Sequence, residues 1–458
     1  MTAIRDYVEQ NKERYLRSLI DFVKIQSVSA DPKRANEVRR AGQWTADILK
    51  NIGFENVGLK ETGGHPAVYG EWLKAGTDKP TILCYGHTDV QPEDPMEKWT
   101  TPPFDPVVKN GNLYGRGADD NKGQCLTQLF GLEALMKLDG KLPVNVKVFL
   151  EGEEEGGTGA TEKFVFDNAK LLACDAVAIS DTAWHSAEMP TIVTSLRGMA
   201  YLEVIVRGPS RDLHSGVYGG KVQNPLNAMG KIIAKIQDEN GVVQIPGFYD
   251  DVVPLSDKEK AEFRAVGDED EWLKKDLGVK ALWGEKGYTT LERNWGRPSC
   301  DVHGIWGGYA GKGTKTVIAA EGGFKISSRI VANQDPEKIA KLYEEYLKKI
   351  CPPGVTLEIK VLHLAYPMMV PIDSPFLEAA ATAFEKGFGK RARMVREGAS
   401  IPITAAFLRA LKAPSIMVGY GLNSDNIHSP DECFPLDHLY NGIVTNYHLY
   451  HEFARVKK

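Results

Sequence analysis

Five short polar segments of this chain carry the residue types that bind metal ions. They are Gly86-His87-Thr88-Asp89, Gly115 to Gly123, Glu151 to Gly157, Ile179-Ser180-Asp181 and Ile427-His428-Ser429-Pro430. Imidazole and carboxylate groups are common ligands of divalent cations in hydrolytic sites. Each segment is a weak signal alone, but together they supply two imidazoles and three carboxylates, enough for two ions that share one carboxylate. The set therefore predicts a hydrolytic site with two metal ions.

His87 and Asp89 stand two residues apart at the end of an apolar run, so in extended geometry both side chains project to the same side. His87 could bind a metal while Asp89 holds its other ring nitrogen; the alternative is a turn histidine beside a solvent-facing carboxylate. Asp120 has two oxygens with which to bridge two cations, and helix capping is its alternative role. For Asp119, capping is the preferred interpretation.

Glu153, Glu154 and Glu155 follow an apolar run and precede two glycines. A run of charges is commonly a solvated surface, but a position directly after a buried strand is a poor place for one. Two adjacent carboxylates can divide the work, because one coordinates a metal while the other accepts a proton from metal-bound water. Asp181 could cap a following segment and His428 could be an ordinary loop residue, so only their joint occurrence with the other segments favours ligation.

An alternation of helices and strands must position these segments. Apolar runs predict strands at 66–72, 81–86, 144–150 and 175–180, and helical spacing predicts helices at 3–25, 36–52 and 122–138. Three of the polar segments directly follow such a strand, and a fourth follows one closely. In α/β folds the polar groups at the strand ends gather at one edge of the sheet, where the chemistry takes place.

The pattern changes at Ser195. Strands are expected at 199–207, 316–319, 324–331 and 355–362, with helices at 224–238 and 336–350. After Pro367 the α/β pattern returns, with helices at 374–388 and 402–412, a strand at 414–418 and a long terminal helix. We therefore expect an α/β catalytic domain formed by residues 1–194 and 366–458, and an inserted α+β domain at 195–365. Residues 247–300 follow no regular pattern. Trp272, Trp283 and Trp295 could line the pocket, pack in the core or support a subunit contact, and core packing is the default expectation.

The composition is that of an ordinary globular protein. Its 458 residues exceed the size of a single core, which favours two domains. A net charge of −5 argues against nucleic-acid binding, and no apolar run approaches the ~18 residues of a membrane span. Arg5, Asp6 and Glu9 are not typical of a secretory signal, and the six cysteines are scattered, with Cys84 and Cys125 interpreted as small buried side chains. We expect a cytoplasmic protein that binds neither nucleic acid nor membrane.

Taken together, the motifs resemble those of the co-catalytic zinc exopeptidases. That family includes carnosine and nonspecific dipeptidases, aminoacylases, glutamate carboxypeptidases and succinyl-diaminopimelate desuccinylases. The resemblance spans nearly the whole chain, and three longer strings indicate the dipeptidase branch. These are Asp212 to Gly220, Val302-His303-Gly304-Ile305, and Arg396-Glu397-Gly398 with Ser400-Ile401-Pro402. The resemblance implies an α/β fold with a zinc-exopeptidase-like catalytic domain and an inserted α+β lid that also dimerises.

The resemblance also implies a set of metal ligands. One ion would be bound by His87 and Glu155 and the other by Asp181 and His428, with Asp120 and a water bridging the two. Zn²⁺ is the first expectation, and Mn²⁺ is the alternative because the ligands are rich in oxygen.

Catalytic and substrate-binding roles follow from the same resemblance. Glu154 would be the general base, Asp89 would orient His87, and His214 of the lid would reach the partner subunit's active site to stabilise the oxyanion. Arg329 would grip the substrate carboxylate, a role suited to a planar guanidinium. Further substrate contacts are implied for Thr316, His363, Glu397 and Ser400. As structural alternatives, Arg329 could pair on a sheet surface, while Thr316, His363 and Ser400 could satisfy backbone groups. The protein would act as a homodimer whose lid residues complete the partner's site.

The sequence departs from the branch at three places. Asn121 follows the bridging aspartate where an acidic residue is usual, and Glu153 replaces a commonly apolar residue. The neighbours of His363 lack the usual glycine-rich pattern. The resemblance further implies a cis peptide bond between Asp120 and Asn121.

The expected function is metal-dependent hydrolysis of dipeptides to amino acids. The nearest alternative is an N-acyl amino acid amidohydrolase that uses the same two metals. A catalytically silent relative is disfavoured because Glu154 and all five ligand positions are present. A nuclease or phosphatase is disfavoured by the proposed carboxylate clamp and by the acidic chain.

Overall fold

The computed structural model describes residues 2–399 and 401–457. The chain divides into two compact units. Unit 1 consists of Met1–Thr194, Val370–Val395 and Ile403–Lys458, and unit 2 consists of Ser195–Met369 and Arg396–Pro402. Unit 2 is thus an insertion that begins after Thr194. The chain re-enters unit 1 at Val370 instead of at the expected residue 366, and the short segment Arg396–Pro402 packs with the insertion.

A nine-stranded mixed sheet has most of its strands in unit 1. In spatial order its strands are β1 (Glu55–Lys60), β2 (Ala67–Trp72), β6 (Asn145–Glu151), β3 (Thr81–His87), β7 (Ala176–Ile179), β18 (Ser415–Met417), β9 (Thr191–Leu196) and β16 (Met368–Met369), and β17 (Arg393–Glu397) pairs with β9. The four neighbours β6, β3, β7 and β18 are parallel. Their carboxyl ends therefore meet at one edge of the sheet.

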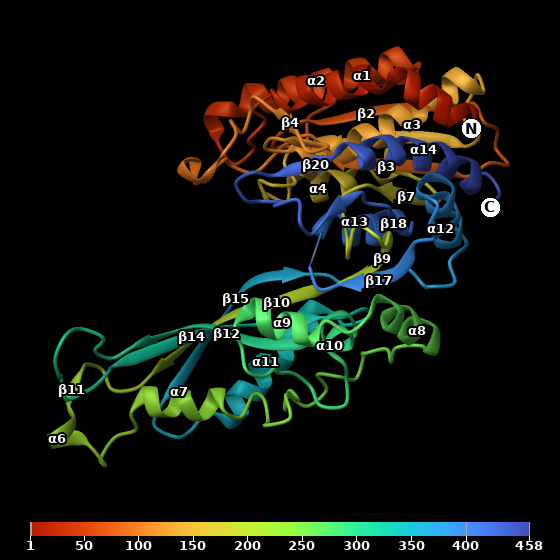
Figure 1. Ribbon diagram of the computed structural model, residues 1–458. Coiled ribbons are helices and arrows are strands. Elements are labelled where there is room, and N and C mark those ends of the chain that lie inside the picture. The colour runs from red at the N-terminus through yellow and green to blue at the C-terminus, as the bar shows by residue number, and fades with distance from the viewer. Residues whose placement is uncertain (1, 400, 458) are drawn as a thin grey trace. The chain divides into compact units, whose positions relative to one another are not determined.

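Helices cover both faces of these parallel strands, which explains why the strands are apolar throughout. Cys84 on β3 contacts Gln128 of α3 (Gln124–Leu138), whereas the next residue, Tyr85, packs its ring on Phe407 of α13 (Pro402–Leu411). Successive strand residues point to opposite faces, so α3 and α13 lie on opposite sides of the sheet (Figure 1). Further helices complete the two layers, namely α2 (Ala35–Ile52), α4 (Ala160–Asp167) and α5 (Ala169–Leu172).

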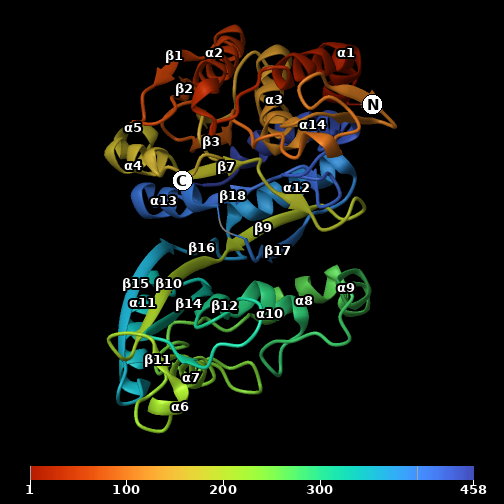
Figure 2. The same ribbon diagram turned by 90° about the vertical axis from the view of Figure 1, so that its left-hand side faces the viewer.

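The two terminal helices pack together in unit 1. Helix α1 (Ala3–Val23) lies beside α14 (Leu436–Phe453), and α14 also packs on α3 and α12 (Pro375–Phe388) (Figure 2). The side chain of Lys122 is buried beneath α1, where Nζ donates to the carbonyls of Phe22 and Ile25 at 3.1 and 2.6 Å. Burial lowers the pKa of this lysine to about 7. Lys122 thus anchors the turn at Ala118–Gly123 to the end of α1.

Two small sheets join loops of unit 1 that are distant in sequence. Strand β5 (Asn112–Tyr114) pairs with β4 (Val107–Lys109) and with β20 (Cys433–Pro435). Strand β8 (Ala183–Trp184) pairs with β19 (Gly421–Leu422). The β5–β20 ladder brings the loop after β5 close to the loop that contains His428.

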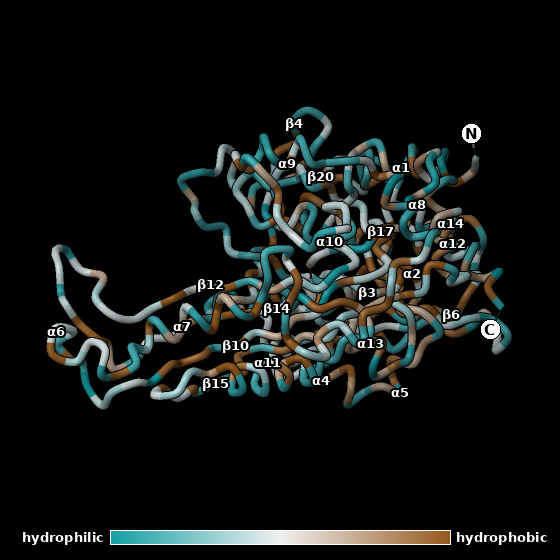
Figure 3. The backbone as a smooth tube through the Cα atoms, turned by 90° about the horizontal axis from the view of Figure 1, so that it is seen from below, coloured by the Kyte–Doolittle hydropathy of each residue, from teal (hydrophilic) through white to brown (hydrophobic). Residues whose placement is uncertain are grey.

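Unit 2 is built on a four-stranded antiparallel sheet. Its strand order is β12 (Ser299–Gly307), β14 (Glu321–Ile330), β10 (Gly198–Arg207) and β15 (Thr356–Ala365). Alternate residues of β10 are buried, and they pack with β14, α7 (Pro225–Ile233) and α11 (Pro336–Ile350) in one hydrophobic core. The hydrophobic stretch of β10 is visible in Figure 3. A short ladder of β11 (Leu213–His214) and β13 (Val317–Ile318), followed by α6 (Ser215–Tyr218), completes this unit.

The predicted α/β class with an inserted α+β segment is confirmed, but several elements were not predicted. Strands β1, β9, β12 and β17 and several strands of two or three residues were missed, and residues 247–300 contain α8 (Asp257–Val266), α9 (Asp270–Leu277) and α10 (Thr290–Gly296). Trp295 packs on Phe263 as expected, but core packing is wrong for Trp272 and Trp283, which are 61% and 67% exposed. Across the described residues, no helix combines the length and apolar character needed to cross a membrane.

Candidate metal centre

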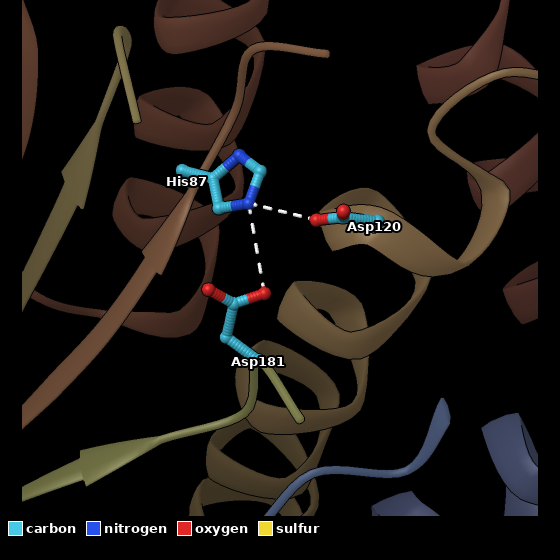
Figure 4. A group of neighbouring side chains, drawn as sticks. All are labelled: His87, Asp120 and Asp181. Carbon is cyan, nitrogen blue, oxygen red and sulfur yellow. Dashed lines mark hydrogen bonds and ion pairs between the residues drawn. The ribbon is translucent and has the colours of Figure 1, made fainter. Parts of the chain in front are cut away.

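The predicted ligands of unit 1 gather at the carboxyl edge of the parallel strands. His87 is the last residue of β3, Asp181 stands two residues beyond β7, and Glu155 lies in the loop that follows β6. Asp120 enters from the turn before α3, and His428 enters from the loop before β20. Figure 4 shows the imidazole of His87 facing the carboxylates of Asp120 and Asp181. All five predicted ligands are thus brought together.

These side chains form two groups that share Asp120. In the first group His87 Nε2 lies 3.0 Å from Asp120 Oδ1 and 3.6 Å from Asp181 Oδ1. In the second group His428 Nε2 lies 3.0 Å from Asp120 Oδ2 and 3.1 Å from Glu155 Oε1. Within each group the potential ligand atoms all lie within 4.8 Å of one another. Each oxygen of Asp120 therefore faces a different imidazole, as a bridging carboxylate requires.

The grouping corrects the pairing that we expected. Asp181, and not Glu155, lies with His87, while Glu155 lies with His428. Strands β6 and β7 both flank β3, so strand adjacency alone does not decide which acid meets His87. The loop after β6 decides it, because this loop carries Glu155 past the end of β3 to His428.

Asn121 ties the first group together. Its Nδ2 donates to the Ser180 carbonyl at 2.6 Å and to Asp181 Oδ1 at 2.8 Å, and its Oδ1 accepts from the His87 backbone N–H at 3.3 Å. An acidic residue at this position could not donate to Asp181 when ionised. The departure from the branch pattern thus has a structural role, and the expected cis peptide between Asp120 and Asn121 is present.

Asp89 connects His87 to the loop that carries the two central glutamates. The Asp89 backbone carbonyl hydrogen-bonds His87 Nδ1 at 3.1 Å, and its carboxylate Oδ1 lies 3.3 Å from the same nitrogen, so Asp89 contacts the ring through both groups. The same carboxylate accepts from the backbone N–H groups of Glu154 at 3.2 Å and Glu155 at 3.0 Å, and from Ser29 Oγ at 2.6 Å. Asp89 therefore positions both the imidazole and the glutamate loop.

Glu153 is buried, with 3% of its surface exposed, so a solvated charge run is the wrong interpretation for this residue. Its carboxylate accepts from the His65 backbone N–H and from Thr158 Oγ1, both at 2.8 Å. The capping role is wrong for Asp119, whose buried carboxylate instead accepts from the side chain of Gln124 at 2.9 Å. These two acids support the loops on either side of the candidate ligands.

The centre carries strong and opposing electrostatic effects. Burial raises the pKa of Glu154 to about 9, and the nearby carboxylates of Asp181 and Glu155 act in the same direction. Hydrogen bonds to Asp120 and Glu155 raise the pKa of His428 to about 10. Burial opposes protonation of His87, but the carboxylates around it outweigh burial and hold its pKa well above the ordinary value. Such a concentration of negative charge favours a cation.

The donor atoms fit two divalent ions. Each group offers one imidazole nitrogen and two carboxylate oxygens, a donor set that suits Zn²⁺ and also Mn²⁺. The second carboxylate oxygen of Asp120 serves the second group without any change of side-chain position. Binding requires neutral imidazoles and ionised carboxylates, so the ions would replace protons at these groups.

The other predicted site residues belong to unit 2. His214 and Thr316 lie side by side, because the backbone N–H of Ser215 donates to the Thr316 carbonyl at 3.0 Å. Arg329 lies on β14 and His363 on β15, where they are paired with Met199 and Tyr201 of β10. Glu397 ends β17 in the segment that packs with unit 2, and Ser400 lies outside the described residues. The roles of these residues toward substrate stay predictions.

Sequence reasoning missed several residues that support the centre. Ser29 and Glu432 are buried and contact the ligand-bearing loops through their side chains. Glu153, considered in the sequence as part of a charge run, is buried and holds its own loop through Thr158. The only available signal for Glu432 was an acidic residue close to His428 in a loop. Acidic residues in loops are common on protein surfaces, so the sequence did not indicate that Glu432 is buried.

Two clusters of nitrogen and oxygen donors that share a carboxylate at a sheet edge define the class of dinuclear metal-dependent hydrolases. Residues 83–452 match the peptidase family M20/M25/M40, and the chain belongs to this family. The family predicted from the sequence motifs is therefore confirmed, and with it the assignment of the protein as a metallopeptidase.

Known relatives align over almost the whole chain. The Cys-Gly metallodipeptidase dug1 of Schizosaccharomyces pombe is 32% identical over 100% of this chain and 99% of its own length. The Beta-Ala-His dipeptidase of Homo sapiens is 30% identical over 94% of this chain and 88% of its own length. Both relatives belong to the dipeptidase branch that the longer motifs indicated.

Solved structures give the same result. The M20 family metallo-carboxypeptidase Sso-CP2 from Sulfolobus solfataricus is 32% identical, with a TM-score of 0.80 over 96% of this chain and 99% of that protein. Human carnosine dipeptidase 1 is 29% identical, with a TM-score of 0.75 over 99% and 98%. The fold of this chain is therefore that of the M20 peptidases.

Proposed function

We propose that this protein is a dinuclear metallodipeptidase that hydrolyses dipeptides and other short peptides to amino acids. The observation that carries the proposal is the pair of ligand groups that share Asp120, with Glu154 next to Glu155 in the same loop. Relatives that are named dipeptidases, each aligned over more than nine tenths of this chain, support the substrate class.

His87, Asp120 and Asp181 would hold one ion, and Asp120, Glu155 and His428 would hold the other, with Zn²⁺ as the first candidate and Mn²⁺ as the second. Two bound cations would supply the charge that polarises the scissile carbonyl, acidifies the attacking water and favours the ionised form of Glu154.

Glu154 is the proposed general base. It would accept a proton from the attacking water and return that proton to the leaving amine, so one carboxylate serves both halves of the reaction. Asp89 holds the backbone N–H of Glu154, which fixes the start of this side chain relative to His87. Both residues are therefore assigned to catalysis, Glu154 directly and Asp89 by positioning.

Residues of unit 2 are proposed to bind the substrate. His214 Nδ1 accepts from the Gly216 backbone N–H at 2.9 Å, which leaves Nε2 to donate to a developing oxyanion. Arg329 would bind the substrate carboxylate, and a homodimer would allow His214 to serve the partner's site. Substrate contacts are also proposed for Thr316, His363, Glu397 and Ser400.

The cytoplasm is the proposed compartment, in keeping with six cysteines that form no disulfide.

The substitution Glu154→Gln tests the proposal. The amide cannot accept the proton, so kcat on a dipeptide should fall by about 10²–10⁴-fold while two cations per chain are retained. Turnover by wild-type protein on dipeptides, N-acetyl amino acids and N-succinyl amino acids would separate the dipeptidase from the amidohydrolase alternative. Normal dipeptide hydrolysis by the variant, or wild-type activity on acyl substrates alone, would contradict the proposal.

A matched control is Glu133→Gln on α3. Glu133 pairs with Arg14 and Tyr7 at the surface of unit 1, so this substitution removes the same charge from a paired glutamate away from the ligand loops. Its kcat should equal that of the wild type.

A further inference from the structure

The loops that carry Asp120 and His428 begin at the same ladder of strands. Cys433 at the start of β20 is paired with Tyr114 at the end of β5. The backbone N–H of Gly115 then donates to the Glu432 carbonyl at 2.9 Å, which extends the contact beyond the ladder. From this point one loop runs forward to Asp120 and the other runs back to His428. A contact that holds these two loops together therefore also sets the distance between Asp120 and His428 in the second group of ligands.

The carboxylate of Glu432 is fully buried between these loops. Its Oε1 accepts from the backbone N–H groups of Asp119 and Asp120, both at 3.1 Å. Its Oε2 accepts from the backbone N–H of Gly117 at 2.9 Å and from Arg116 Nη1 at 2.6 Å. Four donors therefore surround one buried carboxylate. One of those donors is the backbone of the shared ligand itself.

Arg116 extends this contact to the other side. Its Nη2 donates to the Ser429 carbonyl at 3.2 Å, directly after His428. His428 itself has a φ of 60°, a left-handed conformation that a non-glycine residue adopts only where its surroundings hold it. The chain of contacts thus runs from the Asp120 backbone through Glu432 and Arg116 to the backbone beside His428.

We propose that Glu432, together with Arg116, positions the second cation group by fixing the distance between Asp120 and His428. This inference rests on the proposed two-cation function. The pair touches no reacting atom, so it acts through the two ligands. The first group has a separate support, because Asn121 links His87 and Asp181 without Glu432. Because Glu432 also holds the backbone N–H of Asp120, which both groups share, its loss should weaken the second cation more than the first.

Calorimetric titration of chelator-treated protein with Zn²⁺ measures this effect without reference to activity. Wild-type protein should bind two ions per chain in two steps, and His428→Ala identifies the step that belongs to the second group. In Glu432→Gln one oxygen is replaced by an NH₂ group that faces other donors. We expect the affinity of the second step to fall about 10–100-fold, as is usual for outer-shell partners of metal ligands, with the first step within threefold of wild type.

Glu133→Gln is the control and should leave both steps unchanged. Equal affinities of Glu432→Gln and wild type would overturn the inference, and so would an equal loss in both steps. Wild-type protein that binds fewer than two ions would instead overturn the proposed function, so the two failures are distinguishable.

A second variant covers the case in which Glu432→Gln does not fold. Arg116→Lys keeps the positive charge but cannot reach Glu432 and the Ser429 carbonyl together through a planar fork. The second step should again weaken selectively, by a smaller factor than in Glu432→Gln. A wild-type titration curve for Arg116→Lys would overturn the role of Arg116.

Discussion

The two imidazoles that flank Asp120 have opposite surroundings. The His87 side chain is fully buried at the end of a central strand, whereas the His428 side chain is 54% exposed in a loop. His87 inherits its position from the strand ladder, with Asp89 and Asn121 holding its ring and backbone. Asp120 is thus shared by two groups that are positioned differently. The packed core of the fold positions the His87 group, whereas side-chain contacts between loops position the His428 group.

The difference in burial between His87 and His428 shows that the two cation groups are held in place by different interactions. A ligand on a buried strand is ordered by packing, so its position depends on hydrophobic residues far from the chemistry. A ligand in an exposed loop depends on individual polar contacts, here those of Glu432, Arg116 and the Asp431 carboxylate, which accepts from the Thr100 backbone at 2.8 Å. The two halves should therefore respond differently to substitution.

Removing the shared ligand should have the largest effect. In Asp120→Asn one of the two oxygens becomes an NH₂ group, which cannot ligate a cation. Both groups should lose affinity, and metal analysis after dialysis should find fewer than one ion per chain. Retention of two ions by this variant would show that Asp120 does not bridge, and the two groups could then not be treated as sharing a ligand.

Removing each imidazole should distinguish the two halves by stability. In chelator-treated protein, His87→Ala leaves buried carboxylates without their donor and should lower the free energy of unfolding by about 1–3 kcal/mol. His428→Ala also removes a donor to Asp120 and Glu155, but water can reach this half-exposed position, so the loss should be smaller, about 0.5–1.5 kcal/mol. Urea unfolding measures both values, and equal losses in the two variants would contradict the difference in burial.

Asp89→Asn should affect both halves together. Asp89 orients His87 and also holds the backbone of Glu155, so the amide disturbs one ligand of each group. We expect both Zn²⁺ binding steps to weaken about 10–100-fold, in contrast with the selective effect of Glu432→Gln. If only one step changes in the titration, Asp89 supports only one of the two halves.

The pH dependence of cation binding should follow His428. Its pKa is raised to about 10, so at neutral pH it carries a proton that must leave when a cation binds. Affinity at the second group should therefore rise with pH between 6 and 8, by about tenfold per unit for each proton released. Titrations at several pH values measure the slope. A slope near zero would show that His428 is already neutral.

Much of this arrangement could be predicted because the informative residues follow apolar strands. The run before His87 fixed a buried strand, and parallel strands with aligned carboxyl ends must bring His87 and Asp181 to one edge. The pairing of Glu155 with His428 could not be predicted, since it depends on the path of an irregular loop. Sequence patterns indicate helices and strands through their periodicity, but an irregular loop has no periodicity from which its path could be predicted.

Supporting residues were missed for a related reason. Glu153 and Glu432 are acidic side chains in loops, and most such residues are solvated. In the folded protein, however, Glu153 accepts from the His65 backbone and Thr158 Oγ1, and Glu432 accepts from three backbone N–H groups. The burial of Trp272 and Trp283 was also misjudged. Large aromatic residues are usually buried, yet these two lie on the surface of unit 2.

The position of Asp120 between two imidazoles also bears on the order in which the protein acquires its ions. A first cation bound at either group would neutralise part of the carboxylate charge that attracts a second, and would immobilise the Asp120 side chain that the second needs. Electrostatic competition and reduced conformational entropy thus oppose each other at one residue. Loading of two ions would then be cooperative, and the proportion of doubly loaded protein at one equivalent of metal would report the sign of that cooperativity.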